Sequence, residues 1–169
     1  MPPGETLVTG DLVVRNIGEL PVIPAGPVSG RRMRDVPLLT DAAVVVREGR
    51  IAWFGPDAEA VRVAAPGAVQ FDAAGGCVTP GLIDCHTHTV FAGTREREFV
   101  QRLEGRSYAE IAESGGGIRV TVDAVRAATV DQLVEQARPR LARMLCSGVT
   151  AVEIKSGYGL SVEAELKML

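Results

Sequence analysis

Short apolar runs separated by turn signals dominate the first part of the chain. Residues 12–14, 43–46 and 51–54 are rich in valine, isoleucine and aromatic side chains, which favours β-strands. The last two runs flank Glu48 and Gly49, and a glycine there can adopt the positive φ that a tight hairpin requires. We therefore expect a small antiparallel sheet in this region.

A segment that breaks regular structure lies between the first run and the hairpin. It contains several prolines, and Arg31, Arg32 and Arg34 cluster within it. This composition predicts a solvated loop. A binding role for the arginine cluster is the less favoured interpretation.

The pattern changes near Val78. Residues 78–88 begin apolar and end polar, as expected for a buried strand with a polar end. We place a domain boundary here, between residues 1–78 and residues 79–169.

Helical signals follow that strand. Ser107 and Glu110 have the spacing of a capping box. Gly148 is a typical residue to end a helix, whereas Pro139 lies inside the pattern and predicts a kink or a break. Apolar positions recur every four residues along one face, at Leu133, Ala137, Leu141 and Leu145.

Alternation returns at residues 149–155 and predicts a second strand. A glycine-rich loop at residues 156–160 follows, and Ser161 begins a further helix with acidic residues near its start. Strand, helical excursion, strand and helix in succession predict a parallel βα arrangement.

The predicted fold class is α/β. A closed (βα)8 barrel has eight strands in about 250 residues, so residues 79–169 supply only its first βα units. The antiparallel strands before them predict an N-terminal β-sandwich segment over residues 1–78. We therefore expect the chain to be the N-terminal part of a longer, truncated sequence.

Charge and composition exclude some function classes. The net charge of −3, from 18 basic and 21 acidic residues, lacks the concentrated positive field that nucleic-acid binding needs. Residues 1–5 show no basic region followed by an apolar stretch, and the apolar runs are too short to span a bilayer. We expect a cytoplasmic protein that binds neither nucleic acid nor membrane.

The three cysteines, Cys77, Cys85 and Cys146, are odd in number and widely spaced. This indicates neither a disulfide framework nor a thiolate zinc site. We expect them to be buried, inert thiols.

His86 and His88 are the only histidines of the chain. Side chains two apart on a strand point the same way, with Cα atoms about 6.6 Å apart, so the two imidazoles can converge on one ion. A lone His-x-His is also typical of an ordinary polar strand end. The apolar strand before it and the Pro-Gly pair that introduces the strand favour a pair of metal ligands at a barrel active site.

The segment from Pro80 to His88 resembles the first-strand signature of the amidohydrolase superfamily, P-G-x-[IV]-D-x-H-x-H, in which both histidines bind metal. Within that superfamily the chain is similar to the imidazolonepropionase family. The resemblance runs through residues 78–169 and weakens before them, and its main motifs are residues 91–95, 114–118, 144–150 and 153–160.

The resemblance implies substrate-binding roles for Arg95, Tyr158 and Tyr108. A planar guanidinium suits the carboxylate of a propanoate substrate, and a tyrosine hydroxyl can donate a hydrogen bond without adding charge. The alternatives are an ion pair of Arg95 with a glutamate such as Glu98, and ordinary packing for both tyrosines.

Two further features have plainer interpretations. Residues 115–117 are three glycines, but no strand leads into them and no P-loop lysine follows, so we expect a flexible substrate-side loop and not a phosphate cradle. Glu153 and Lys155 share a strand face, for which we expect a buried ion pair.

The resemblance implies hydrolysis of 4-imidazolone-5-propanoate to N-formimidoyl-L-glutamate in histidine degradation by a metal-activated water. The metal is zinc or iron, because imidazole accepts both, and the remaining ligands and acid/base residues lie outside this chain. Two alternatives stay open: another amidohydrolase of the cyclic-amide or nucleobase-deaminase type, and a non-catalytic fragment. The oligomeric state, a homodimer included, is also left open.

Overall fold

The computed structural model describes residues 11–169, which divide after Pro80 into two compact units. The predicted absence of a signal segment in residues 1–5 lies outside the described residues. In the described part of the chain, no helix is long and apolar enough to cross a bilayer.

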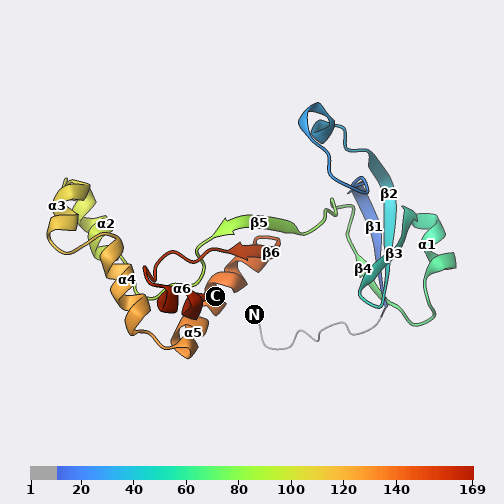
Figure 1. Ribbon diagram of the computed structural model, residues 1–169. Helices are drawn as coiled ribbons and strands as arrows, with labels where there is room; N and C mark the ends of the chain where they lie inside the picture. The colour runs from blue at the N-terminus through green and yellow to red at the C-terminus, as the bar shows by residue number, and fades with distance from the viewer. Residues whose placement is uncertain (1–10) are drawn as a thin grey trace. The chain divides into compact units, whose positions relative to one another are not determined.

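The first unit is a four-stranded sheet with the order β3-β2-β1-β4 (Figure 1). Strands β1 (Leu12–Pro21), β2 (Leu38–Arg47) and β3 (Arg50–Pro56) are antiparallel, as expected, and Glu48 and Gly49 turn the hairpin with φ of 51° and 73°. The sequence did not predict β4 (Val69–Asp72), which pairs with β1 in parallel, or helix α1 (Asp57–Val63). Residues 11–80 thus form one sheet with a helix, and the parallel strand β4 makes this sheet mixed where an antiparallel one was expected.

Apolar side chains of this unit gather on both sides of the sheet. One cluster is centred on Val13, Val45 and Ala60, the last from α1, and another on Ile17 and Val44. The proline-rich segment between β1 and β2 is exposed as expected, although Gly30–Arg34 form a short 3-10 helix within it.

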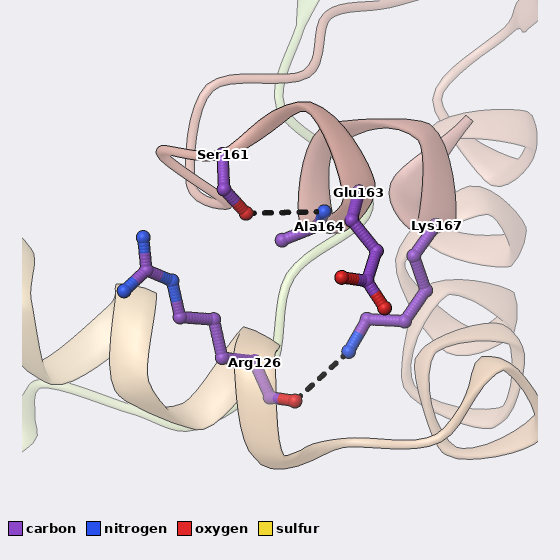
Figure 2. Close-up of a pocket in the computed structure, with 5 residues that line it drawn as sticks. All are labelled: Arg126, Ser161, Glu163, Ala164 and Lys167. Carbon is purple, nitrogen blue, oxygen red and sulfur yellow. Dashed lines mark hydrogen bonds between the residues drawn. The ribbon is translucent and has the colours of Figure 1, made fainter.

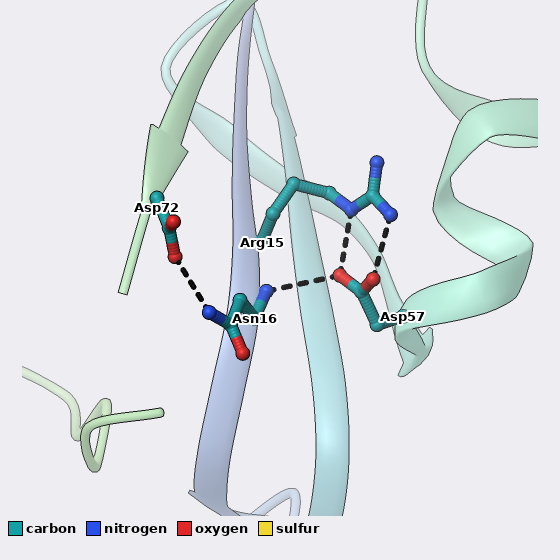
Figure 3. Close-up of polar contacts among 4 residues, drawn as sticks. All are labelled: Arg15, Asn16, Asp57 and Asp72. Atoms are coloured by element: carbon teal, nitrogen blue, oxygen red, sulfur yellow. Dashed lines mark hydrogen bonds and ion pairs between the residues drawn. The ribbon is translucent and has the colours of Figure 1, made fainter. Parts of the chain in front are cut away.

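A polar network fixes α1 to the sheet at an irregularity of β1. The register of β1 shifts between Val14 and Ile17, and Asn16 has a φ of 53°. The Arg15 guanidinium donates Nε–H and Nη2–H bonds of 2.6 Å to the Asp57 carboxylate, which also accepts from the Asn16 amide (Figure 3). Asn16 in turn donates to Asp72 of β4.

The second unit contains two parallel strands, β5 (Leu82–Thr87) and β6 (Val149–Ile154), joined by four helices. The expected βα arrangement is therefore present in this unit. Its helices are α2 (Glu96–Leu103), α3 (Tyr108–Glu113), α4 (Ile118–Ala127), α5 (Val130–Cys146) and, after β6, α6 (Val162–Met168).

Local signals set several of these boundaries. The predicted capping box of Ser107 with Glu110 begins α3, and Thr129 with Gln132 forms another at the start of α5. Gly148, with a φ of 86°, follows α5 as expected. The break expected at Pro139 is wrong, because α5 runs through that residue.

The core of the second unit lies among its helices. Ala92, Val125, Ala128, Leu133 and Met168 are buried together, whereas β5 is exposed, with Leu82 and Ile83 at 55% and 73%. The strand was predicted, but its burial was not borne out, since a two-stranded sheet leaves its apolar faces open. The expected burial of Cys77, Cys85 and Cys146 is wrong as well, because all three are exposed.

Candidate functional site

The two histidines lie where β5 ends. His86 is the second-last residue of β5, and His88 directly follows the end of the strand. The ring centres of the two histidines are 5.5 Å apart. Two imidazoles bound at about 2.1 Å to one tetrahedral metal have ring centres about 5 Å apart. Both rings are exposed, so this pair of nitrogen donors fits the first half of a metal site.

Further protein ligands for that site are missing from the described residues. Within residues 11–169, no three side chains of histidine, cysteine, aspartate or glutamate come close enough together to hold a metal ion. Structural metal sites use four protein ligands and catalytic zinc sites commonly three. The histidine pair alone is therefore an incomplete site.

Hydrogen bonds to β6 hold the end of β5 in place. The Thr87 hydroxyl donates to the Glu153 carbonyl at 2.9 Å, and the Lys155 amide donates to the Thr87 carbonyl at 2.7 Å. Thr87 therefore faces away from the two histidines that flank it, as the alternation of a strand requires.

Tyr158 lies beside His88. Its ring centre is 5.3 Å from that of His88 and 6.3 Å from that of Phe91. A Cβ added to Gly157 would lie 3.3 Å from His88 Cε1, so the glycine lets the loop after β6 approach the histidine closely. The parallel strands thus bring two predicted site residues, 70 positions apart, to the same edge.

Arg95 and Tyr158 line the same cleft. Its volume is ≈ 520 Å³, and Phe91, Thr121 and Arg140 also contribute to its walls. Arg95 caps the start of α2, and its Nε–H donates to Glu98 at 3.0 Å, so the alternative ion pair considered for this arginine is formed.

Glu98 also joins this arginine to the glycine loop. The pKa of Glu98 is lowered, chiefly by its hydrogen bond with Arg95, and its other carboxylate oxygen accepts from the Gly117 amide at 3.0 Å. The hydroxyl of Tyr108 lies 3.5 Å from where a Cβ of Gly117 would be. The pKa of Arg95 is raised, first by Glu98, with smaller contributions from Tyr108 and Tyr158. Tyr108 and Tyr158 therefore both lie close enough to Arg95 to act on its charge.

Arg140 is a site residue that the sequence analysis missed. Its Nη1 donates to the carbonyls of Thr89 and Phe91 at 3.0 and 2.9 Å, and its guanidinium carbon lies 3.5 Å from the centre of the Phe91 ring. Burial lowers the pKa of Arg140. The same side chain lines a cleft of ≈ 430 Å³ that includes His88. An arginine among others on a helix carries no sequence signal for this role.

The ion pair between Lys155 and Glu153 is formed, but it is not buried. The two side chains are 37% and 55% exposed. The expected burial required further strands over this face of β6, and residues 11–169 contain none.

Comparison with known proteins identifies relatives for most of the chain. It is 55% identical over 132 residues to an imidazolonepropionase of Cereibacter sphaeroides, 57% over 131 residues to one of Aromatoleum aromaticum, and 55% over 132 residues to one of Yersinia enterocolitica. Each match covers 78% of this chain. The chain spans about a third of the length of these curated relatives. The resemblance to this family is thus confirmed. No family model matches the chain.

Solved structures support the fold. Escherichia coli guanine deaminase covers 94% of this chain with a TM-score of 0.62 and 14% identity, and the match takes up 33% of that protein. An uncharacterised metal-dependent hydrolase of Pyrococcus furiosus covers 92% with a TM-score of 0.55 and 15% identity, over 47% of its own length. The chain therefore has the mixed α/β fold found in part of these larger hydrolases.

Proposed function

We propose that the whole protein to which this chain contributes is an imidazolonepropionase. It hydrolyses 4-imidazolone-5-propanoate to N-formimidoyl-L-glutamate, a step of histidine degradation. Water adds across the ring C–N bond: the carbonyl carbon gains the hydroxyl and becomes a carboxylate, and the ring nitrogen gains the proton.

The observation that carries this proposal is that an arginine, a tyrosine and a histidine lie near the same end of β5. Arg95 and Tyr158 line one cleft, and His88 contacts Tyr158 from the end of β5. A cation, a neutral hydrogen-bond donor and a pair of imidazoles are the groups that an anionic cyclic amide and its hydrolysis require.

His86 and His88 would hold one zinc or iron ion together with ligands from outside this chain. Such an ion supplies a water of lowered pKa and polarises the ring carbonyl. Arg95 binds the propanoate carboxylate, and Tyr158 orients the ring through its hydroxyl. Tyr108, beside the glycine loop, is a further substrate contact.

The proposal includes the wider organisation expected from the sequence. Residues 1–78 contribute to a β-sandwich, residues 79–169 begin a (βα)8 barrel, and the later strands supply the missing ligands and acid/base groups. The protein acts in the cytoplasm on a small molecule, without nucleic acid or membrane. A homodimer of the full-length protein is compatible with this function.

The test is an assay of the purified full-length protein for loss of 4-imidazolone-5-propanoate and formation of N-formimidoyl-L-glutamate. Substitution His88→Ala should abolish turnover, whereas Arg119→Ala on the exposed face of α4 should leave it unchanged. Turnover of an aminopurine or another cyclic amide, with none of the imidazolone, would favour the broader amidohydrolase alternative.

A further inference from the structure

The loop that carries Tyr158 is held by a single carboxylate. Glu165, on α6, accepts hydrogen bonds from the amides of Gly157 at 2.6 Å, Gly159 at 3.0 Å and Leu160 at 2.8 Å. The first bond goes to Oε2 and the other two go to Oε1, so both oxygens are engaged. Charge-assisted bonds of this kind are among the stronger hydrogen bonds in proteins.

The backbone of this loop is shaped around the carboxylate. Gly157 has a φ of 145° and Leu160 a φ of 51°, which turn successive amides toward one point. A Cβ added to Gly159 would lie 2.6 Å from the backbone of Ala164, so this glycine permits the loop to lie directly against α6.

A cation holds the carbonyl side of the same loop. Arg126, at the end of α4, donates from Nε to the Gly159 carbonyl at 2.8 Å and from Nη2 to the Leu160 carbonyl at 3.1 Å. The loop is therefore bonded on its amide side by Glu165 and on its carbonyl side by Arg126.

Helix α6 is itself held in place by hydrogen bonds, so the backbone that carries Glu165 has a fixed position. Ser161 caps the helix through the Ala164 amide, and Lys167 Nζ donates to the Arg126 carbonyl at 3.0 Å (Figure 2). The same Nζ donates to the carbonyls of Val125 and Ala128 at 2.7 and 2.8 Å. These bonds join α6 to the last turn of α4. Ala164 and Met168 are buried on the same helix.

We infer that Glu165 is a positioning residue, which fixes Tyr158 against His88 by ordering the loop that carries Tyr158. This inference rests on the proposed function for its catalytic consequence, but its structural part stands on the three amide bonds. Burial alone would raise the pKa of Glu165; the amides of Leu160, Gly157 and Gly159 outweigh it and keep that pKa below its usual value. The carboxylate is therefore ionised at neutral pH.

The substitution Glu165→Gln tests this role in the full-length protein. In either orientation the glutamine amide turns an N–H toward a loop N–H, so at least one loop bond is lost. Glu163→Gln is the matched control, since Glu163 is exposed on the same helix (Figure 2). The carboxylate bonds to the loop amides all come from Glu165. Glu165→Asp, which keeps the charge, serves as the second variant if Glu165→Gln does not fold.

Hydrogen exchange of residues 157–160 is the first measurement. Loss of a hydrogen bond to a charged group should speed exchange there about tenfold in Glu165→Gln, and Glu163→Gln should match the wild type. Unchanged exchange in both Glu165 variants would overturn the inference. This measurement needs no substrate, so it decides the structural part even if the proposed activity is absent.

A double-mutant cycle is the second measurement. If Glu165 acts through Tyr158, Glu165→Gln should lower kcat/KM about tenfold alone but less than about twofold in a Tyr158→Phe background. Independent, multiplying effects would show that Glu165 does not work through Tyr158 and would overturn the inference.

Discussion

The guanidinium of Arg95 offers more donors than its contact with Glu98 uses. That contact engages Nε and Nη2, which leaves Nη1 free of Glu98 at the cleft. Glu98 also holds the arginine in one orientation, which reduces the entropy lost when a carboxylate binds. An ion pair and a substrate role are thus compatible in one side chain.

The substitution Arg95→Ala in the full-length protein should therefore raise KM for imidazolonepropionate by about ten- to a hundredfold, the range for a hydrogen bond to a charged group. A larger effect on KM than on kcat is expected, because the propanoate is remote from the reacting bond. Steady-state kinetics measure both constants, with the exposed neighbour Arg97→Ala as control. Unchanged kinetics in Arg95→Ala would show that this arginine does not bind the substrate and only forms the ion pair with Glu98.

Asp57 makes a second residue-scale prediction, in the N-terminal sheet. Its hydrogen bonds with Arg15 and the Asn16 amide lower its pKa from 3.8 to about 2. A depressed folded-state pKa stabilises the fold above the unfolded-state pKa, and that contribution is lost as the pH falls from about 4 to 2. Asp57→Asn should cost about 1 kcal/mol at pH 7, with a difference from wild type that shrinks below pH 4.

Urea unfolding at several pH values measures this difference. Glu59→Gln, an exposed carboxylate of the same helix, is the control and should change neither the stability nor its pH dependence. A constant difference across that pH range would contradict the assignment of the effect to the Asp57 charge.

At the scale of single residues, the sequence could predict positions that local spacing sets. His86 and His88 share a face because a strand alternates, and a β-strand is what the structure has there. Arg140 and Arg126 escaped prediction because they bond to the backbone of segments 51 and 33 residues away. Glu165 escaped it because an acidic residue near a helix start already has a local explanation, and its bonds go to the loop before that helix. Nothing near an arginine on a helix indicates which carbonyl it will reach.

At the scale of elements, a cap residue made two of the helix starts predictable. Ser107 and Ser161 begin α3 and α6 as expected, since a side-chain oxygen at the N-cap satisfies amides that the helix leaves open. Strand β4 and helices α1, α2 and α4 were missed because each is short or lacks a cap signal. Of the kink or break predicted at Pro139, the break is absent, since α5 runs through this exposed residue.

The capping box of α5 gives an element-scale prediction. The backbone N–H of Gln132 donates to Thr129 Oγ1 at 3.2 Å. The backbone N–H of Thr129 donates to the side-chain oxygen Oε1 of Gln132 at 2.9 Å. Thr129→Ala should destabilise the protein by about 1 kcal/mol, and Thr129→Ser should retain most of the stability. Thermal unfolding compares the two variants, and exchange of the first amides of α5 shows whether the loss is local. Equal midpoints for Thr129→Ala and wild type would mean that packing alone sets this helix start.

At the scale of the whole molecule, burial was the least predictable property. The apolar faces of β5 read as buried in the sequence, yet Ile83 is 73% exposed. An apolar strand face is typical of a strand that other elements cover in the whole protein. This chain spans about a third of its relatives' length, so covering elements can lie outside it. The parallel direction of β5 and β6 was predicted correctly, because it depends only on the connection between them.

Metal binding should separate this chain from the full-length protein. Two imidazoles on one strand supply half of the ligands of a typical site, so residues 1–169 should bind zinc or iron weakly and below one equivalent. The full-length protein should retain about one metal per chain after dialysis, and His86→Ala or His88→Ala should lower that content sharply. Removal by a chelator should abolish turnover, and zinc or iron should restore it. Elemental analysis measures the content, with Cys85→Ala as a control beside the ligands. Tight, stoichiometric binding by residues 1–169 alone would show that the described part of the chain already holds a complete site.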